Sequence, residues 1–204
     1  VFKTKDVSYI DHTLLPSYEE LLKEPLEYAN SFRVQNQNTD ALNADILVEP
    51  YGDWNVVQNT PSVPLNRNEL DTVYDLHYER DYHPIYKSIG HVKAIDEVKH
   101  SIIANRGCSG GCSFCALTYH QGRTISARSK ESIMCEAKEI VNMSDFKGYI
   151  NDVGGPTANF LEPMCDKQKK HGVCKTKACL SPECSQLKVS HKRYLDILTA
   201  LRNL

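Results

Sequence analysis

The sequence lacks several features that define special classes of protein. It contains no run of about 18 apolar residues, which excludes a membrane-spanning helix. Its net charge of −2 leaves no electrostatic footprint for binding nucleic acid. Apolar residues make up 41% and charged residues 25%, which excludes a disordered tail, a collagen-like repeat and a coiled coil. The 204 residues are enough for one sizeable globular domain or two small ones.

Cysteine is absent from the first hundred residues, and all eight cysteines lie in the second half. The charge is uneven as well, with a net of −8 over residues 1–100 and +6 over residues 101–204. The cysteines form two tight groups rather than a framework spread along the chain, so metal binding by thiolates is favoured over disulfides. Free thiolates require a reducing compartment, and we therefore expect a cytoplasmic protein.

The order of predicted elements indicates an α/β fold. In the first half, a hairpin over residues 45–57 and a short helix over residues 68–75 stand out from irregular stretches, with a loop over residues 35–44. In the second half, a strand within residues 100–105 precedes a helix capped by Ser129, and a second strand over residues 146–153 follows. A final helix covers residues 194–201. Strand, helix, strand is a βαβ unit, whose chemistry lies after the strands in a parallel sheet or barrel.

The predicted domain division follows from the contrast between an irregular first half and a second half with a regular order of elements. Residues 1–98 are expected to be an irregular linker or extension that packs on the core. Residues 99–204 are expected to form the core, with a Cys-rich insertion at residues 165–184.

Three cysteines lie on one glycine-rich loop directly after the predicted strand at residues 100–105. Cys108, Cys112 and Cys115 have the spacing C-x3-C-x2-C. Three thiolates hold three irons of a four-iron cluster and leave the fourth iron open to a small molecule. The alternative is zinc or reduced structural thiols, although a structural zinc site normally takes four ligands in two pairs.

The motifs around this loop resemble those of the radical SAM superfamily, and of its YgiQ-type members in particular. The resemblance rests on Arg-Gly-Cys-Ser-Gly-Gly-Cys-Ser-Phe-Cys at residues 106–115, Asp-Val-Gly-Gly-Pro-Thr-Ala-Asn at residues 152–159 and Val-Glu-Pro-Tyr-Gly-Asp at residues 48–53. It implies a (βα)6 partial TIM-type barrel with a [4Fe–4S] cluster on Cys108, Cys112 and Cys115. S-adenosylmethionine would bind the open iron.

The resemblance also implies cofactor-binding residues. Phe114, before the last cysteine, would lie near the adenine, and the end of the second strand would contact the methionine amino group. That strand end consists of Gly154, Gly155, Pro156 and Thr157, and it lacks the acidic residue that usually follows the two glycines.

The implied activity is reductive cleavage of S-adenosylmethionine to methionine and a 5′-deoxyadenosyl radical. The radical would take a hydrogen atom from a substrate that the resemblance does not identify. An electron donor such as flavodoxin or ferredoxin is expected as a partner, with no membrane and no nucleic acid. The alternative function is a non-catalytic, zinc-binding structural module in which both cysteine groups hold metal.

A second group of cysteines lies downstream, with intervals of eight, four and four residues. Its members are Cys165, Cys174, Cys179 and Cys184. Four thiolates suit a second metal or iron–sulfur cluster, and free or oxidised thiols are the alternative. Five lysines of this segment would offset the thiolate charge: Lys167, Lys169, Lys170, Lys175 and Lys177.

Two arginines after the cluster loop, Arg123 and Arg128, have two interpretations. Either they pair with a carboxylate of cofactor or substrate, or they anchor the loop. Cys135 is expected to be an ordinary thiol.

The length limits what this chain achieves alone. Only 96 residues follow Cys108, whereas six βα units need roughly 200. We therefore expect a central fragment of a longer protein. Its exposed sheet edges should make it self-associate, and it should be inactive in isolation.

Overall fold

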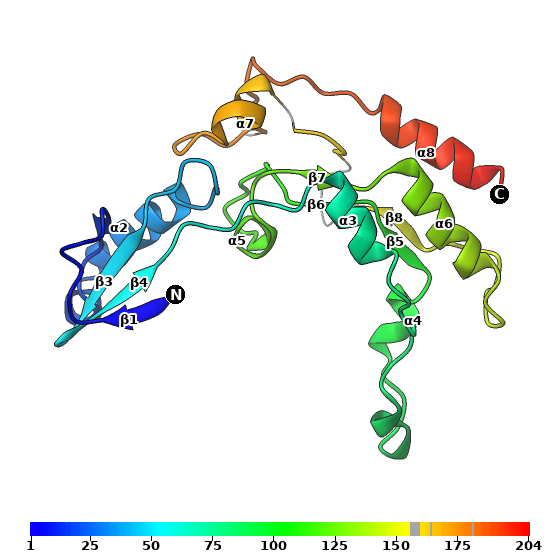
Figure 1. The fold of residues 1–204 in the computed structure, drawn as a ribbon, viewed down its shortest axis with the longest axis horizontal. Coiled ribbons are helices and arrows are strands. Elements are labelled where there is room, and N and C mark those ends of the chain that lie inside the picture. Colours follow the sequence, from blue (N-terminus) through cyan, green and yellow to red (C-terminus); the bar gives the residue numbers. More distant parts are fainter. Residues whose placement is uncertain (156–159, 164, 181) are drawn as a thin grey trace. The chain divides into compact units, whose positions relative to one another are not determined.

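The computed structural model describes residues 1–155, 160–163, 165–180 and 182–204 (Figure 1). These residues form two compact units. The first consists of Val1–Pro64, Ser109–Thr124 and Cys165–Leu187, and the second of Leu65–Cys108, Ile125–Met164 and Lys188–Leu204. Each unit is therefore assembled from three segments that are distant in the sequence.

The first unit is built on a four-stranded sheet with the strand order β1-β4-β3-β2. Its strands are β1 (Phe2–Thr4), β2 (Thr13–Leu14), β3 (Leu47–Tyr51) and β4 (Trp54–Gln58). Its helices are α1 (Tyr18–Lys23), α2 (Pro25–Gln37), α5 (Leu117–Gln121) and α7 (Asp166–His171). The predicted hairpin is confirmed, because β3 and β4 pair in antiparallel register with Val48 opposite Val57. Both valines are fully buried, so the hairpin supplies the apolar centre of this unit.

Local sequence signals explain how α1 and α2 follow each other. Ser17 and Glu20 form a capping box at the start of α1. Pro25 occupies the first turn of α2, where its missing N–H removes no helical hydrogen bond. The helix then runs to Gln37, so the loop predicted for residues 35–44 begins three residues late.

The second unit contains a parallel strand pair, an antiparallel strand pair and several helices. The strands are β5 (Ser101–Ile103), β6 (Asn105–Arg106), β7 (Ser126–Ala127) and β8 (Asp152–Gly154). The helices are α3 (Arg67–Tyr74), the 3₁₀ helix η1 (Pro84–Ser88), α4 (Ala94–Val98), α6 (Lys130–Val141) and α8 (Lys192–Arg202).

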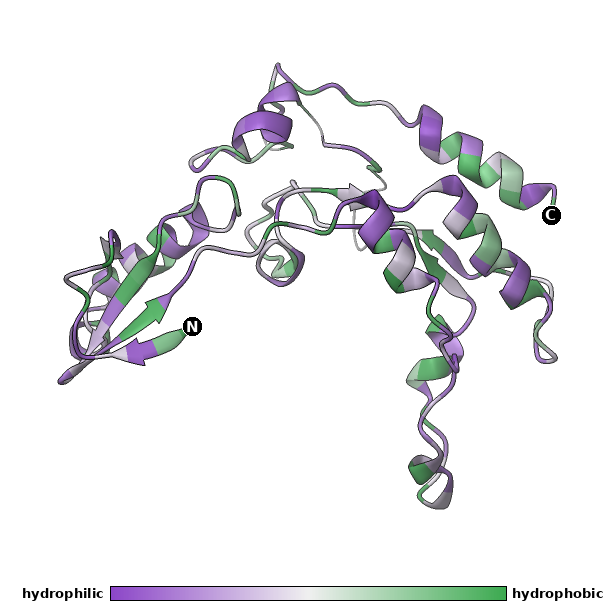
Figure 2. Ribbon diagram, viewed as in Figure 1, coloured by the Kyte–Doolittle hydropathy of each residue, from purple (hydrophilic) through white to green (hydrophobic). Residues whose placement is uncertain are grey.

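The predicted βαβ unit is present as β5, α6 and β8. Strands β5 and β8 pair in parallel, with Ile102 opposite Val153. Ser129 caps α6 by accepting a hydrogen bond from the Ser132 N–H. The apolar face of α6 packs with β5 and α8 into the core of the unit (Figure 2). That core comprises Ile102, Ala104, Ala127, Ile133, Ala137, Ile140, Leu161 and Ile197.

The strand predicted over residues 146–153 is shorter than expected, because β8 begins only at Asp152. Phe146 and Ile150 still pack against the core, but Gly148 adopts a φ of +91°, which is incompatible with a continuous strand. The apolar residues Phe146 and Ile150 therefore reflect core packing rather than strand pairing.

The architecture is mixed α/β with small sheets. In the described part of the chain, the strands form one sheet of four and two pairs, and none closes into a barrel. No helix among the described residues is both long enough and apolar enough to cross a bilayer.

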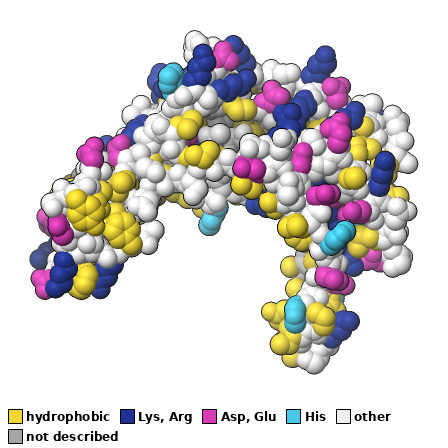
Figure 3. Space-filling view, viewed as in Figure 1, with side chains coloured by type: hydrophobic (Ala, Val, Ile, Leu, Met, Phe, Trp, Pro, Cys, Tyr) yellow, Lys and Arg dark blue, Asp and Glu magenta, His cyan; other side chains and the backbone are white. Residues whose placement is uncertain are grey.

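The segment around η1 contributes no buried residue to the second unit. Ile85, Tyr86 and Ile89 are exposed on it, and Figure 3 shows hydrophobic side chains on the surface of this segment. The apolar core of the second unit is therefore centred on α6 instead.

Candidate functional site

The cysteine loop begins where β6 ends. Gly107 and Gly111 adopt positive φ values of 85° and 63°, which residues with a Cβ rarely adopt, so the loop needs glycine at both positions. Cys108 is the last residue of its segment in the second unit, and Cys112 and Cys115 belong to the first unit. A backbone hydrogen bond of 3.1 Å from the Cys115 N–H to the Cys112 carbonyl closes a turn just before α5.

The thiols of this loop are accessible to a ligand. Cys112 is exposed, while Cys108 and Cys115 are partly buried. None of the three forms a disulfide. Throughout the described ranges, no three His, Cys, Asp or Glu side chains stand together as a ready metal site. The loop therefore provides the donors but not a finished coordination shell.

Phe114 is the most exposed large apolar side chain of the loop, at 90% of its surface. An aromatic ring with an open face is suited to stacking on a flat heterocycle. The sequence places this ring between the second and third cysteines of the motif.

The end of β8 is crowded against Asn105. A Cβ on Gly155 would lie 2.4 Å from both the Nδ2 and the Oδ1 atom of Asn105, so only glycine fits there. Gly154 is buried, and its carbonyl accepts a hydrogen bond of 2.8 Å from the Ala104 N–H. The other two predicted residues of this motif, Pro156 and Thr157, lie outside the described residues.

Asn105 was not singled out by the sequence, and it is the most informative residue at this position. It is 1% exposed, and neither Nδ2 nor Oδ1 has a hydrogen-bond partner among the described residues. A buried polar group without a partner costs about 1–3 kcal/mol. Such a group in a strand end marks a place where a polar ligand would complete the hydrogen bonding. Its only sequence signal is an amide directly after a buried strand.

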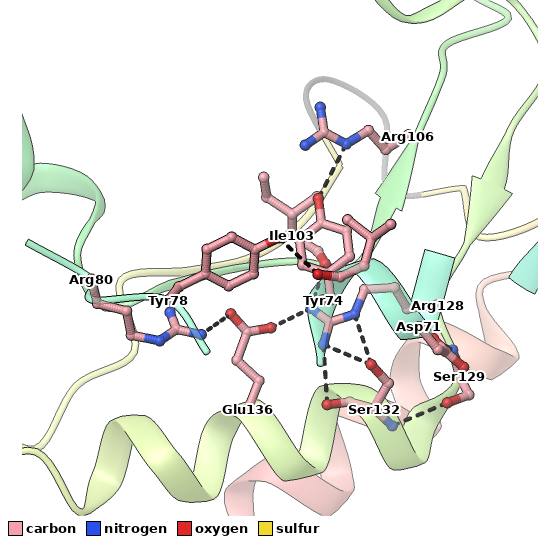
Figure 4. Close-up of polar contacts among 11 residues, drawn as sticks. Asp71, Tyr74, Tyr78, Arg80, Ile103, Arg106, Arg128, Ser129, Ser132 and Glu136 are labelled. Carbon is pink, nitrogen blue, oxygen red and sulfur yellow. Dashed lines mark hydrogen bonds and ion pairs between the residues drawn. The ribbon is translucent and has the colours of Figure 1, made fainter. Parts of the chain in front are cut away.

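Arg128 is an internal anchor of the second unit (Figure 4). It is 1% exposed, and its guanidinium lies 4.2 Å from the centre of the Tyr74 ring. It donates hydrogen bonds to the Ile103 carbonyl at 3.0 Å and to the Ser132 hydroxyl at 2.8 Å. Its Nη1 also pairs with the Glu136 carboxylate. Because every nitrogen of this guanidinium is already used, Arg128 links β5 and α3 to α6 and has no N–H left for a carboxylate ligand.

The Arg128 cluster extends to two further elements. The second carboxylate oxygen of Glu136 pairs with Arg80, so one buried carboxylate holds two arginines. The Asp71 carboxylate accepts a hydrogen bond of 2.9 Å from the Ser129 N–H, which joins α3 to the start of α6. These contacts fix the region between β5 and α6.

Arg123 is also an anchor, in the first unit. It is 6% exposed and donates hydrogen bonds to the carbonyls of Cys174 at 2.9 Å and Lys177 at 3.0 Å. It thereby ties the end of the cluster-loop segment to the segment that carries the second cysteine group.

The second cysteine group is close together in space as well as in sequence. Lys167 Nζ lies 3.1 Å from the Cys174 sulfur, and Gln168 Nε2 lies 3.3 Å from the Cys179 sulfur. Burial raises the pKa of the Cys179 thiol, and the thiols of Cys165, Cys174 and Cys184 are near enough to raise that pKa further. These four thiols therefore share one neighbourhood.

Comparison with known proteins finds one family model and several similar proteins. Residues 2–101 match the family model described as radical SAM N-terminal. The UPF0313 protein of Clostridium perfringens (strain SM101 / Type A) is 48% identical over 200 residues, which are 98% of this chain and 30% of that protein. The UPF0313 protein of Clostridium botulinum (strain Kyoto / Type A2) is 48% identical over 202 residues, which are 98% of this chain and 31% of that protein.

The chain thus spans about 30% of the length of these relatives. No solved structure matches it.

Proposed function

Since this chain carries a radical SAM N-terminal domain and is homologous to UPF0313 proteins over 98% of its length, we propose that it is the cluster-binding part of a radical SAM enzyme. The loop of Cys108, Cys112 and Cys115 would hold the [4Fe–4S] cluster. The radical SAM family implies this cluster and S-adenosylmethionine as cofactors. The observation that carries the assignment to this part of the chain is the three-thiol loop, which follows the first strand of a βαβ unit.

The donor set of the loop fits the cluster. Its three cysteines are not in disulfides, and they match three irons while leaving one iron open. Cys112 is exposed, so a preassembled cluster could reach it without unfolding the chain. The loop glycines allow the backbone to fold closely around a bound group.

The strand end beside Asn105 fits the methionine part of S-adenosylmethionine. The Asn105 amide offers one acceptor and two donors for an amino group and a carboxylate, and its buried polar atoms have no partner among the described residues. Gly155 packs directly against this amide, where a Cβ would clash with it, so the glycine lets the end of β8 approach Asn105. We propose Gly154, Gly155, Pro156 and Thr157 as the other residues along the methionine, and Phe114 as the neighbour of the adenine.

When bound, the cluster and S-adenosylmethionine supply reductive cleavage to methionine and a 5′-deoxyadenosyl radical, which takes a hydrogen atom from a substrate. The residues of this chain bind and orient. Asn105 would hold the amino acid end, Phe114 would cover the base, and the Arg128 anchor would keep the strand ends in place. A low-potential donor such as flavodoxin or ferredoxin would deliver the electron.

The βα unit of β5, α6 and β8 is proposed as the first of a (βα)6 partial barrel. The other units would lie in the part of the longer relatives that this chain does not span, which is about 70% of their length. The substrate and the completed active site would belong to that whole protein.

Anaerobic reconstitution of the chain with iron and sulfide tests the cluster assignment. We expect about four irons and four sulfides per chain, with the brown absorbance of an iron–sulfur cluster. Replacing Cys108, Cys112 and Cys115 by Ala should remove this absorbance. Cys135→Ala is the matched control, since this free thiol is exposed on α6 and lies outside both cysteine groups.

Electron paramagnetic resonance of the reduced cluster tests the cofactor. Adding S-adenosylmethionine should change the spectrum of the unsubstituted protein, because the cofactor binds the open iron. Zinc in place of iron on the three-thiol loop, with no brown absorbance after reconstitution, would instead identify a structural zinc module.

A further inference from the structure

Four cysteines of the first unit share one neighbourhood that lies outside the proposed cluster loop. Cys165 is the residue before α7, and Cys174 follows two residues after the Gly172 turn. Cys179 and Cys184 are joined by a 3.1 Å hydrogen bond from the Cys184 N–H to the Cys179 carbonyl. The four cysteines thus stand on three short stretches of backbone in the same unit.

Side chains of α7 donate hydrogen bonds to two of the sulfurs. Lys167 Nζ lies 3.1 Å from Cys174 Sγ, and Gln168 Nε2 lies 3.3 Å from Cys179 Sγ. Gln168 is 3% exposed, so a buried amide faces a buried sulfur. Hydrogen bonds to cysteine sulfur are a regular feature of thiolate metal centres, where they orient the ligand and offset its charge.

The segment between the cysteines has little regular structure, yet buried side chains hold it in place. The Asn43 amide donates hydrogen bonds to the carbonyls of His171 at 3.0 Å and Val173 at 2.8 Å. The Asp40 carboxylate accepts the Val173 N–H at 3.3 Å, and Gly172 lies so close that a Cβ there would be 2.1 Å from that carboxylate. Arg123 fixes the Cys174 carbonyl from the other side. These contacts therefore fix the path of the chain at residues 171–174, directly before and at Cys174.

The surrounding charge favours thiolates. The segment carries Lys167, Lys169, Lys170, Lys175 and Lys177, and Figure 3 shows Lys and Arg side chains over α7. Four thiolates around a divalent ion carry a net charge of −2, which these cations would offset. Lys175 is partly committed, since its Nζ lies 3.1 Å from the Asp45 carboxylate.

We propose that Cys165, Cys174, Cys179 and Cys184 form a tetrathiolate site for a thiophilic metal, occupied by a zinc ion or an iron–sulfur cluster. The described side chains do not yet form a coordination shell. A metal site is rarely preformed before the metal binds, because metal binding draws the thiolates together and is coupled to local folding. The contacts from Asn43, Asp40 and Arg123 hold backbone groups of residues 171–174 and do not use the sulfurs.

The site borders the loop of the first cysteine group. A Cβ on Gly111 would lie 3.5 Å from the Ala178 Cβ, and Ala178 stands directly before Cys179. A cavity of about 260 Å³ lies between these segments, lined by residues that include Gly111, Thr118, Arg123 and Lys177. Metal binding at the four cysteines would therefore stabilise the surface against which the Cys112 side of the cluster loop packs.

Metal analysis of the chain with Cys108, Cys112 and Cys115 replaced by Ala isolates this site from the proposed cluster. After anaerobic purification, we expect one zinc per chain, or iron and sulfide in equal amounts. The first result identifies a zinc ion, and the second an iron–sulfur cluster. The absence of both metals overturns the proposal, and the cluster assignment on the first loop is unaffected by that outcome.

Substitutions locate the metal. Cys174→Ser and Cys184→Ser should each weaken binding of Co²⁺, used as a spectroscopic probe, at least tenfold, and Gln168→Leu about tenfold. Cys135→Ser on α6 should leave Co²⁺ binding unchanged. Equal Co²⁺ affinity in the Cys174→Ser, Cys184→Ser and Cys135→Ser variants overturns the proposal.

Alkylation keeps the test valid if a substituted chain fails to fold. In the metal-loaded chain without substitutions in this group, the four thiols should resist alkylation and become reactive together when a chelator removes the metal. Four thiols that react independently, with or without chelator, contradict a shared site.

Discussion

At the scale of single residues, Asn105 provides the sharpest test of cofactor binding. Asn105→Ala removes an amide whose polar atoms have no partner among the described residues, so the free energy of unfolding should change by less than about 1 kcal/mol. The affinity for S-adenosylmethionine should fall about tenfold or more, since one hydrogen bond to a charged group contributes about 1.5–3 kcal/mol. Equilibrium binding to the reconstituted protein measures this change.

Iron content provides the check on this variant. Asn105→Ala should retain the full cluster, and Asn142→Ala, at the exposed end of α6, should bind the cofactor normally. If Asn105→Ala binds as tightly as the unsubstituted protein, the strand end does not hold the methionine.

Single residues differ in how visible they are in the sequence. The cysteines, Phe114 and the paired glycines were recognisable because their motifs are local. Asn105 was not, because its meaning depends on its burial and on Gly155, which is fifty residues away in the sequence. The role of Arg128 was open for the same reason, since only the contacts with Tyr74 and Glu136 identify it as an anchor. The type of a residue predicts which interactions its side chain can make, and the tertiary contacts decide which of these interactions it makes in the folded protein.

At the scale of elements, α6 depends on the charge cluster on its buried side. Glu136→Gln removes the carboxylate that pairs with Arg128 and Arg80, and it leaves a buried guanidinium without its counter-charge. Breaking a buried pair from one side costs about 3–5 kcal/mol, so we expect the second unit to lose about that much stability. Chemical denaturation followed by circular dichroism measures the loss.

Glu139→Gln is the matched control on the same helix, because Glu139 is exposed. It should change the free energy of unfolding by less than about 0.5 kcal/mol. Replacing Arg128 and Glu136 together by Met should cost less than the sum of the single substitutions, because the fully buried Arg128 guanidinium is no longer left without its counter-charge. Additive losses would show that the pair does not stabilise α6 as a unit.

The link between α4 and the turn after α6 should depend on pH. The Lys99 ammonium lies 2.7 Å from the Asp145 carboxylate and lowers its pKa below the ordinary 3.8, while that carboxylate raises the pKa of Lys99 above 10.5. A carboxyl group whose pKa is lowered by folding stabilises the folded state at any pH above its pKa in the unfolded chain. This stability is lost as the pH falls through its pKa in the folded protein. The lysine contribution is present below 10.5 and is lost as pH rises through its higher folded pKa.

Asp145→Asn should therefore reduce the denaturation midpoint at neutral pH and have little effect below the pKa of the carboxyl group. Denaturation midpoints of the variant and of the unsubstituted protein, measured from acid to neutral pH, should differ at neutral pH and become equal in acid. The control is Asp196→Asn on α8, an exposed carboxylate whose removal should leave the profile unchanged. A difference that is constant across this range would show that the salt bridge contributes nothing to stability.

Helices and strands were predictable where the signal was local. The Ser129 cap, the apolar stripe of α6 and the turn of the β3–β4 hairpin are contiguous in sequence, and each element formed where expected. The long strand over residues 146–153 failed because apolar spacing alone does not distinguish strand pairing from irregular packing on a core. A partial barrel could not be tested by local signals at all, because it depends on strands beyond the single parallel pair.

At the scale of the whole molecule, the division into units cuts across the sequence. The first unit takes two later segments, Ser109–Thr124 and Cys165–Leu187, and the second unit begins at Leu65. Contacts such as the hydrogen bond from the Val173 N–H to Asp40 join residues that are more than a hundred positions apart. No composition change marks such contacts, so the sequence showed the contrast between its halves but not the segments that fold together.

The last prediction concerns the 204-residue chain on its own. It spans about 30% of the length of its UPF0313 relatives, and its parallel pair of β5 and β8 is a sheet of only two strands. Unpaired strand edges promote association with other chains. We therefore expect oligomers rather than a uniform monomer when mass is measured by light scattering.

The same two-strand sheet should limit catalysis. A radical cofactor needs a site that excludes water and competing reactions. A single βα unit encloses only part of such a site. With the cluster loaded and dithionite as reductant, the chain should form 5′-deoxyadenosine at least about a hundredfold more slowly than a full-length UPF0313 relative, because incomplete positioning alone costs about that factor. Iron content measured in both samples separates slow chemistry from missing cluster. A monodisperse monomer with full-length activity would mean that one βα unit suffices, and the proposed six-unit barrel would then be wrong.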